Sequence, residues 1–326
     1  MTNTNPKMPN VVLLNPNPDP LVARILGRFP GLKLTVCDNY DGMADMIPRE
    51  RPEVVLAFKI GTSGTFPREA ILDTDSVKWI QASGAGVDHW MPWDPEQVFL
   101  TNASGIHGDV MSEFVAWAML NHQLGMPAYA AQQKARLWQK NLLMPVSGLT
   151  LAIIGFGAIG EEVGRVAKAL GMRVLAVRAH PRPSPAADDV VGLDSMNEVL
   201  TQADYVHLVL PLTPDTRGLI DAEVLAAFKP GAYFINTGRG GLVDEDALID
   251  CLNDGHISGA AIDVFAEEPL PAESPFWTMD NVIVVPHASG DASDWHMRVV
   301  DLFCDNLARW IAGETLKNIV DPTRGY

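Results

Sequence analysis

Three side chains that could carry out acid–base chemistry stand near the ends of apolar runs in the second half of the chain. They are Arg239, Glu268 and His287. An arginine fork binds a carboxylate through two hydrogen bonds, a histidine gives or takes a proton near neutral pH, and a nearby glutamate favours the protonated histidine. Because parallel sheets bind ligands outside the carboxyl ends of their strands, we expect these residues to meet in one crevice.

Each of the three residues also has a plainer interpretation. Arg239 could form a salt bridge within a loop, Glu268 could be a solvated surface charge, and His287 could cap a helix. For a single polar residue any of these would be the ordinary outcome. Three such residues on successive strand ends favour a catalytic site instead.

A glycine-rich turn in the middle of the chain indicates where a nucleotide would bind. It lies between an apolar run at 149–154 and a helix expected over 161–170, and a strand is expected over 172–177. Its glycines would permit a tight turn, the close approach of a pyrophosphate and close helix–strand packing. A G-x-G-x-x-G alone is weak evidence, but this order of elements favours a dinucleotide site. The turn consists of Gly155, Phe156, Gly157, Ala158, Ile159 and Gly160.

A second glycine-rich stretch, at 82–89, ends an expected strand in the first third of the chain. Backbone N–H groups in such a stretch, here those of Ala85 and Gly86, can approach a small anion. A tight turn without a ligand would have the same sequence, and the spacing leaves both interpretations open.

The elements that must position these residues alternate between short apolar runs and helical patterns, which predicts an α/β fold with parallel sheets. The length of 326 residues suits two domains. The apolar helix expected over 109–124 could join two domains or pack on another subunit. We expect strands over 11–14, 32–37, 54–58, 77–81, 98–102, 149–154, 172–177, 205–210, 232–236, 257–264 and 282–285, and further helices over 21–29, 41–47, 221–228, 244–253 and 291–312.

Composition excludes several kinds of partner. The net charge of −16, from 24 basic and 40 acidic residues, argues against nucleic acid. The apolar stretches are shorter than the about 20 residues that a membrane helix needs, and residues 1–10 have no apolar signal core. Cys37, Cys251 and Cys304 fit a reducing compartment and lack the spacing of metal ligands. We therefore expect a cytoplasmic protein without a metal, a membrane or a nucleic-acid partner.

Six motifs resemble, in the same order, those of the D-isomer-specific 2-hydroxyacid dehydrogenases, and the resemblance covers almost the whole chain. They are GAGVD at 84–88, GFGAIG at 155–160, LPLTPDT at 210–216, NTGRG at 236–240, DVFAEEP at 263–269 and PHA at 286–288. The resemblance implies a Rossmann dinucleotide-binding domain, 105–291, inserted in a flavodoxin-like substrate domain, 1–104 and 292–326. Both would be doubly wound parallel sheets.

The resemblance also implies roles for individual residues. Arg239 would hold the substrate carboxylate and keto oxygen, His287 would give or take the proton, and Glu268 would orient His287. The backbone of Ala85 and Gly86 would also contact the carboxylate. Residues that would contact the cofactor, besides the glycine turn, are Pro211, Thr216, Thr237, Gly238, Asp263 and Gly290.

The region around residues 105–150 would form a homodimer by the same resemblance. Trp138 in this region would then reach the substrate crevice of the neighbouring subunit, as a tryptophan does in the glyoxylate and hydroxypyruvate reductases.

The expected cofactor follows from a departure from the family pattern. NAD-dependent members usually carry an aspartate at the end of the second strand of the nucleotide domain, and here Arg178 stands in that place, with Arg182 four residues later. An arginine fork can bind the 2′-phosphate of NADP, whereas an acidic residue would repel it. We expect NADP as the preferred cofactor and NAD as a possible one.

The expected function is the NADPH-dependent reduction of a small 2-oxo acid, of the glyoxylate and hydroxypyruvate class, to the D-2-hydroxy acid. One alternative is an enzyme that resembles phosphoglycerate dehydrogenase. A second is a nucleotide-sensing binding protein similar to the C-terminal-binding corepressors, which resemble the same family.

Overall fold

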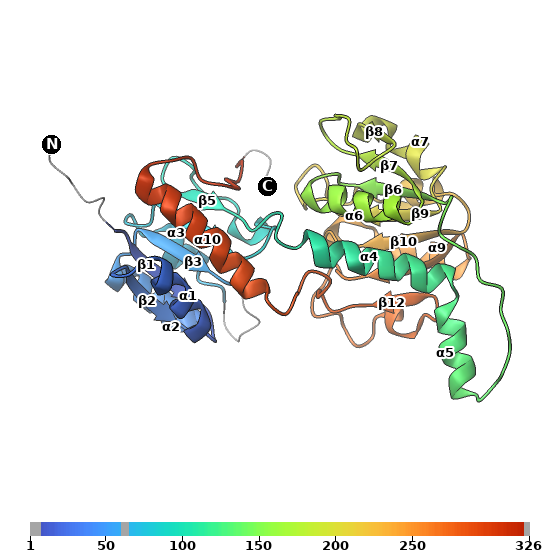
Figure 1. The fold of residues 1–326 in the computed structure, drawn as a ribbon, viewed down its shortest axis with the longest axis horizontal. Helices are drawn as coiled ribbons and strands as arrows, with labels where there is room; N and C mark the ends of the chain where they lie inside the picture. The colour runs from blue at the N-terminus through green and yellow to red at the C-terminus, as the bar shows by residue number, and fades with distance from the viewer. Residues whose placement is uncertain (1–7, 60–64, 323–326) are drawn as a thin grey trace. The chain divides into compact units, whose positions relative to one another are not determined.

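The computed structural model describes residues 8–59 and 65–322, and the chain divides into two compact units (Figure 1). The first unit contains both ends of the chain, Met1–Ile106 and Ser293–Tyr326, and the second is His107–Ala292. The sequence analysis placed these boundaries at 104/105 and 291/292. Each unit is an α/β domain built on one parallel sheet, so the predicted fold class is confirmed.

The described residues of the first unit form five strands in the order β2-β1-β3-β4-β5, which is the flavodoxin-like order. Alternate side chains of β1 enter two cores: Val12 and Leu14 pack against α2 and α3, while Val11 and Leu13 pack against α1 and α10. Helices therefore cover both faces of the sheet. Its elements are β1 (Asn10–Leu14), α1 (Asp19–Arg28), β2 (Lys33–Cys37), α2 (Tyr40–Glu50), β3 (Val54–Ala57), α3 (Arg68–Leu72), β4 (Trp79–Ala82), β5 (Phe99–Thr101) and α10 (Trp295–Ala312).

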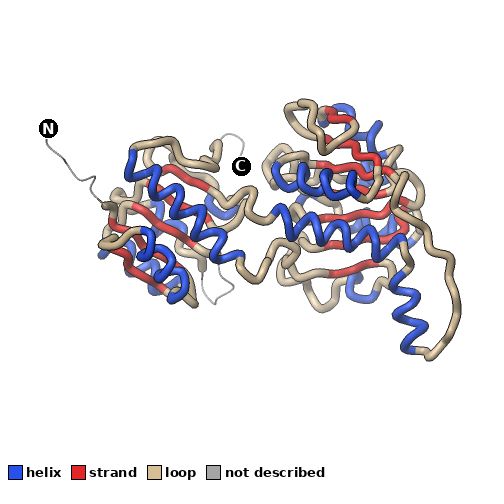
Figure 2. The backbone as a smooth tube through the Cα atoms, viewed as in Figure 1, coloured by secondary structure: helices blue, strands red, loops and turns tan. Residues whose placement is uncertain are grey.

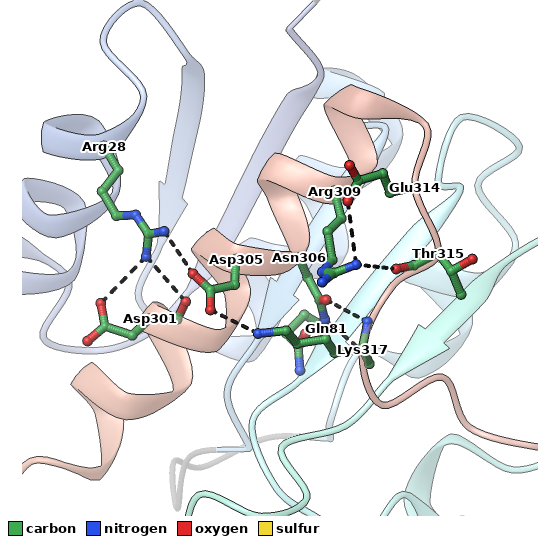
Figure 3. A network of polar contacts seen from close by, with 9 residues as sticks. All are labelled: Arg28, Gln81, Asp301, Asp305, Asn306, Arg309, Glu314, Thr315 and Lys317. Carbon is green, nitrogen blue, oxygen red and sulfur yellow. Dashed lines mark hydrogen bonds and ion pairs between the residues drawn. The ribbon is translucent and has the colours of Figure 1, made fainter.

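Helix α10 fixes the C-terminal part of the chain to the first unit. Arg28 donates to Asp305 at 2.8 Å, and the buried amide of Asn306 donates to Gln81 at 3.2 Å (Figure 3). The helix begins at Trp295 and not at 291 as predicted, because residues 288–292 form turns in which Asp291 N–H donates to the carbonyl of Ala288.

The second unit has seven parallel strands in the order β12-β11-β10-β9-β6-β7-β8, a Rossmann order with one further strand. Helices α4 and α6 cover one face, and α7, α8 and α9 cover the other. Its elements are α4 (Gly108–Gln123), α5 (Met126–Lys134), β6 (Thr150–Ile154), α6 (Ala158–Ala169), β7 (Arg173–Val177), β8 (Asp189–Val191), α7 (Met196–Leu200), β9 (Tyr205–Leu208), α8 (Ala222–Ala226), β10 (Ala232–Asn236), α9 (Glu245–Asn253), β11 (Ile257–Ile262) and β12 (Val282–Val284).

Several predicted boundaries in the second unit were wrong. Helix α6 begins at Ala158 and not at 161, because the last three residues of the glycine turn already belong to its first turn. The short strand β8 was missed, since three residues carry too little pattern. Helix α5 lies in a segment for which no element was predicted. Together with the irregular chain that follows it, α5 extends away from the sheet of the second unit (Figure 2).

None of the helices among the described residues is long and apolar enough to cross a membrane. Within the same part of the chain, no cluster of three or more His, Cys, Asp or Glu side chains could hold a metal ion.

Candidate active site

The glycine turn that follows β6 fits a dinucleotide, because each glycine meets a different steric condition. Gly155 has φ +112°, and a Cβ there would lie 2.7 Å from the carbonyl of Val209. A Cβ at Gly160 would lie 2.5 Å from the carbonyl oxygen of Gly155, which is the close packing of helix on strand. Apart from its two chain neighbours, no described residue lies within 4 Å of a Cβ placed at Gly157, so a ligand can approach the backbone there.

The first turn of α6 offers backbone N–H groups at this point. Gly157 is the N-cap residue, and no side chain of the described chain caps the helix. Phe156 is buried, and its N–H donates to Val177 on the neighbouring strand, which fixes the turn to the sheet. Ala158 and Ile159 begin the helix. The predicted cofactor turn therefore has the shape and the donors that a pyrophosphate requires.

Arg178 and Arg182 both lie close to Glu161, a residue that the sequence analysis did not single out. Arg178 follows β7, and its Nη1 atom lies 3.6 Å from Oε1 of Glu161 in the first turn of α6. Nη2 of the exposed Arg182 lies 3.7 Å from the same oxygen. Two guanidinium groups thus converge beside the glycine turn, on a single carboxylate.

Glu268 and His287 form a hydrogen-bonded pair between Oε2 and Nδ1 at 2.8 Å. The other oxygen of Glu268 accepts the N–H of Phe265 at 3.0 Å. Burial raises the pKa of Glu268, but the hydrogen bonds from His287 and Phe265 and the charges of His287 and Arg239 lower it more, so the carboxyl group titrates below its ordinary range. Glu268 is therefore an oriented anion and not a freely solvated charge.

The backbone also holds His287 in place. Its φ is +51°, a left-handed conformation that is uncommon for residues other than glycine, and its N–H donates to the carbonyl of Asp263 at 2.8 Å. His287 does not cap a helix, because α10 begins eight residues later. Asp263 is buried, and its Oδ1 accepts the N–H of Ala288 at 2.7 Å. Burial raises the pKa of Asp263 in spite of its hydrogen bonds from Ser289 and Ala288.

Arg239 follows β10 in a tight glycine loop. Its Nη1 donates to the carbonyl of Gly238 at 2.7 Å, and Oδ1 of Asn236 accepts the N–H of Gly238 at 3.0 Å. A Cβ at Gly240 would lie 1.9 Å from the backbone of Phe265, so this loop must pass against the loop that carries Glu268. The electrostatic effect of Arg239 on Glu268 agrees with this closeness.

Four other predicted cofactor residues form hydrogen bonds within the second unit. The hydroxyl of Thr216 donates to the carbonyl of Pro211 at 2.7 Å and closes the loop after β9. The Thr237 hydroxyl lies 2.8 Å from Nε2 of His207. The carbonyl of Gly290 lies 2.9 Å from Nδ1 of His107.

The sequence analysis missed Glu245, although it supports the acid–base pair. Its Oε1 accepts the N–H of Ala266 at 2.7 Å and so holds the loop that leads to Glu268. Burial, together with the nearby charges of Asp246 and Glu268, raises its pKa. Glu245 begins α9 and is separated from Ala266 by β11, so no spacing signal links the two residues.

The remaining predicted residues lie elsewhere. Ala85 and Gly86 belong to the first unit, just beyond β4, where the Asn102 amide donates to the carbonyl of Ala85 at 2.9 Å. Trp138 lies in the segment after α5 and is 96% exposed. Within the second unit, by contrast, Arg239, Glu268 and His287 follow β10, β11 and β12, which are neighbours in the sheet.

Comparisons with known proteins identify the family. The family profile described as "D-isomer specific 2-hydroxyacid dehydrogenase, NAD binding domain" matches residues 116–289. A glyoxylate/hydroxypyruvate reductase B from Yersinia pestis is 30% identical over 96% of this chain and 98% of that protein. A D-3-phosphoglycerate dehydrogenase from Methanocaldococcus jannaschii is 32% identical over 85% of this chain but only 53% of its own length, so the chain spans about half of that relative.

A solved structure is similar over the whole chain. It is a D-isomer specific 2-hydroxyacid dehydrogenase from Xanthobacter autotrophicus Py2 in complex with NADPH and MES, with a TM-score of 0.87, 30% identity, and coverage of 98% of this chain and 100% of that one. These matches show that the chain belongs to the D-isomer-specific 2-hydroxyacid dehydrogenases and is an NAD(P)-dependent enzyme.

Proposed function

We propose that this enzyme reduces a small 2-oxo acid, of the glyoxylate and hydroxypyruvate class, to the D-2-hydroxy acid with NADPH. The observation that carries the proposal is the Glu268–His287 pair, held beside Arg239 on three neighbouring strand ends of a nucleotide-binding fold. The reductase from Yersinia pestis supports the substrate class.

His287, Arg239 and Glu268 have separate roles in the proposed reaction. The cofactor, when bound, supplies a hydride to the keto carbon. Because Glu268 holds Nδ1 of His287, its Nε2 atom is the one that can deliver a proton to the developing alkoxide. Arg239 binds the substrate carboxylate and polarises the carbonyl group. Glu268 keeps the imidazole in the productive orientation.

The cofactor preference rests on Arg178 and Arg182. Both guanidinium groups lie beside the glycine turn, where the adenosine ribose would bind. The NADPH complex of the relative from Xanthobacter autotrophicus is consistent with this choice.

The deciding experiment measures kcat/KM for glyoxylate, hydroxypyruvate, pyruvate and 3-phosphohydroxypyruvate, each with NADPH and with NADH. We expect the highest values for glyoxylate or hydroxypyruvate with NADPH. No oxidation of either cofactor with any of these acids would refute the substrate class.

A second candidate is the phosphoglycerate dehydrogenase reaction, favoured by the relative from Methanocaldococcus jannaschii. The phosphorylated substrate in the same panel tests it. A clear preference for 3-phosphohydroxypyruvate over hydroxypyruvate would replace the first proposal with this one.

We further propose a homodimer formed through α4, α5 and the segment after α5. Trp138 and Leu142 in this segment are each 96% exposed, and such apolar surface is costly to leave in water. By this proposal Trp138 would contact the partner's substrate crevice.

Sedimentation at micromolar concentration should give about twice the chain mass of 35.4 kDa. Leu142→Asp should shift the species toward the monomer, whereas the control Leu193→Asp, at an exposed leucine outside the segment, should not. A wild-type protein that sediments only as a monomer would contradict the dimer.

A further inference from the structure

Glu161 is the carboxylate on which the two arginines of the cofactor site converge. Its Oε1 atom lies 3.6 Å from Nη1 of Arg178 and 3.7 Å from Nη2 of Arg182. It stands directly after Gly160, in the first turn of α6, while the arginines lie beyond β7. The three charges therefore form one group beside the glycine turn, with a net charge of one positive unit.

The distances show how Glu161 holds the arginines. Both exceed the range of an N–H···O hydrogen bond, so the carboxylate attracts the guanidinium groups without saturating their donors. Nη1 of Arg178 is buried and has no hydrogen-bond partner among the described residues. An unpaired buried donor is costly, so this atom would gain from an acceptor that comes closer.

We propose that Glu161 lowers the selectivity for NADPH, because its carboxylate competes with the 2′-phosphate for Arg178 and Arg182. The inference rests on the proposed NADP site. NADH carries a hydroxyl at the same position, so the competition affects it much less. Glu161 is thus a specificity-determining residue that moderates the preference set by the two arginines.

A purely positioning role would have the opposite sign. If Glu161 mainly kept the arginines in place for the phosphate, its loss would weaken NADPH binding. If it competes, its loss frees two donors and removes a negative charge near the phosphate, and NADPH binding becomes tighter. The direction of the change therefore decides between the two.

The test compares Glu161→Gln with wild type in the ratio of kcat/KM for NADPH to that for NADH. We expect the ratio to rise by about threefold to tenfold, which is the size of one partly solvated charge interaction. Adenosine 2′-monophosphate should inhibit the variant more strongly than the wild type, while inhibition by adenosine 5′-monophosphate should stay the same. These nucleotides isolate the effect of the 2′-phosphate from the rest of catalysis.

Glu162→Gln is the matched control. Glu162 stands in the same turn of α6 and loses the same charge, but its carboxylate pairs with Arg165. We expect the control to leave the cofactor ratio within about twofold of wild type. An equal effect in both variants would show a general effect of charge and would overturn the inference.

The outcomes also separate this inference from the proposed function. If wild type prefers NADPH but Glu161→Gln lowers or does not change the ratio, the competition is refuted and the NADP site stands. If neither protein distinguishes the cofactors and adenosine 2′-monophosphate inhibits neither, the phosphate site itself is wrong, and the inference is overturned with it.

Discussion

Two carboxylates at the carboxyl edge of the second sheet face basic side chains in different ways. Glu268 is hydrogen-bonded to His287 at 2.8 Å, and its other oxygen is held by a backbone N–H. Glu161 lies 3.6 and 3.7 Å from Arg178 and Arg182. The first pair has a fixed geometry, whereas the second group is held by charge alone.

The difference fits what each group would have to do. Proton transfer requires an imidazole that keeps its orientation through the reaction, and a short hydrogen bond within a tight loop provides that. A site that accepts and releases a phosphate requires donors that can change partners. Loose ion pairs meet this condition, because little bonding is lost when a better acceptor arrives.

The largest expected effect comes from breaking the fixed pair. His287→Ala should lower kcat by about 10²–10⁴-fold, the usual contribution of general acid–base catalysis. The dissociation constant for NADPH should change little, because His287 is proposed to act on the substrate. Glu268→Gln serves as the comparison and should cause a smaller loss, since it keeps the imidazole but removes the anion. A His287 variant that retains more than about a tenth of the wild-type kcat would refute the assignment.

Reversing the charge of Arg178, which lies near Glu161 without a hydrogen bond, should have the next largest effect on activity. Charge-assisted hydrogen bonds contribute about 1.5–3 kcal/mol each, so Arg178→Asp should lower the kcat/KM ratio of NADPH to NADH by roughly a hundredfold. The ratio is measured in both proteins at one ionic strength. Arg165→Asp, which reverses a charge elsewhere on α6, is the control. An unchanged ratio in the Arg178 variant would show that this residue does not bind the phosphate.

The glycine turn that precedes Glu161 can be tested by two glycine substitutions with different outcomes. Gly160→Ala should lower the free energy of unfolding by about 1–3 kcal/mol, because its Cβ would lie 2.5 Å from a backbone oxygen. In Gly157→Ala the added Cβ has no described residue within 4 Å besides its chain neighbours, so the free energy of unfolding should stay within about 0.5 kcal/mol of wild type. Its KM should nevertheless rise for both cofactors. Denaturant titration and kinetics would contradict this account if both variants behaved alike.

The buried histidine His207, which is hydrogen-bonded to Thr237, makes the stability of the fold depend on pH. Burial lowers the pKa of His207 to about 3, whereas an unfolded chain protonates this histidine at its ordinary pKa of about 6.5. Between these values the unfolded state binds the additional proton, so stability falls as the pH falls, by at most about 1.4 kcal/mol per pH unit. His207→Gln should remove this part of the slope between pH 6 and pH 4. Equal slopes in denaturant titrations of the two proteins would contradict the buried neutral histidine.

The sequence determined the fold class and much of the candidate site. Short apolar runs that alternate with helical patterns indicate parallel sheets that are covered by helices on both faces. Each apolar run that was predicted as a strand in the second unit forms one. The glycine turn could also be predicted, since its conformation depends on residues that are close to it in the sequence. Arg239, Glu268 and His287 could be chosen because each stands near a strand end, and parallel strands end on the same edge.

Only the tertiary structure decided which side chains meet. The contact of Arg178 with Glu161 depends on the rotation of α6 against β7, which fixes where a side chain in the first helical turn points. The left-handed backbone of His287 and the bond from Ala266 to Glu245 likewise depend on loops that pack against each other. Hydrophobic periodicity sets which face of an element is buried, but it carries no information about the pairing of polar groups between elements, because that pairing depends on distances of a few ångströms in the folded chain.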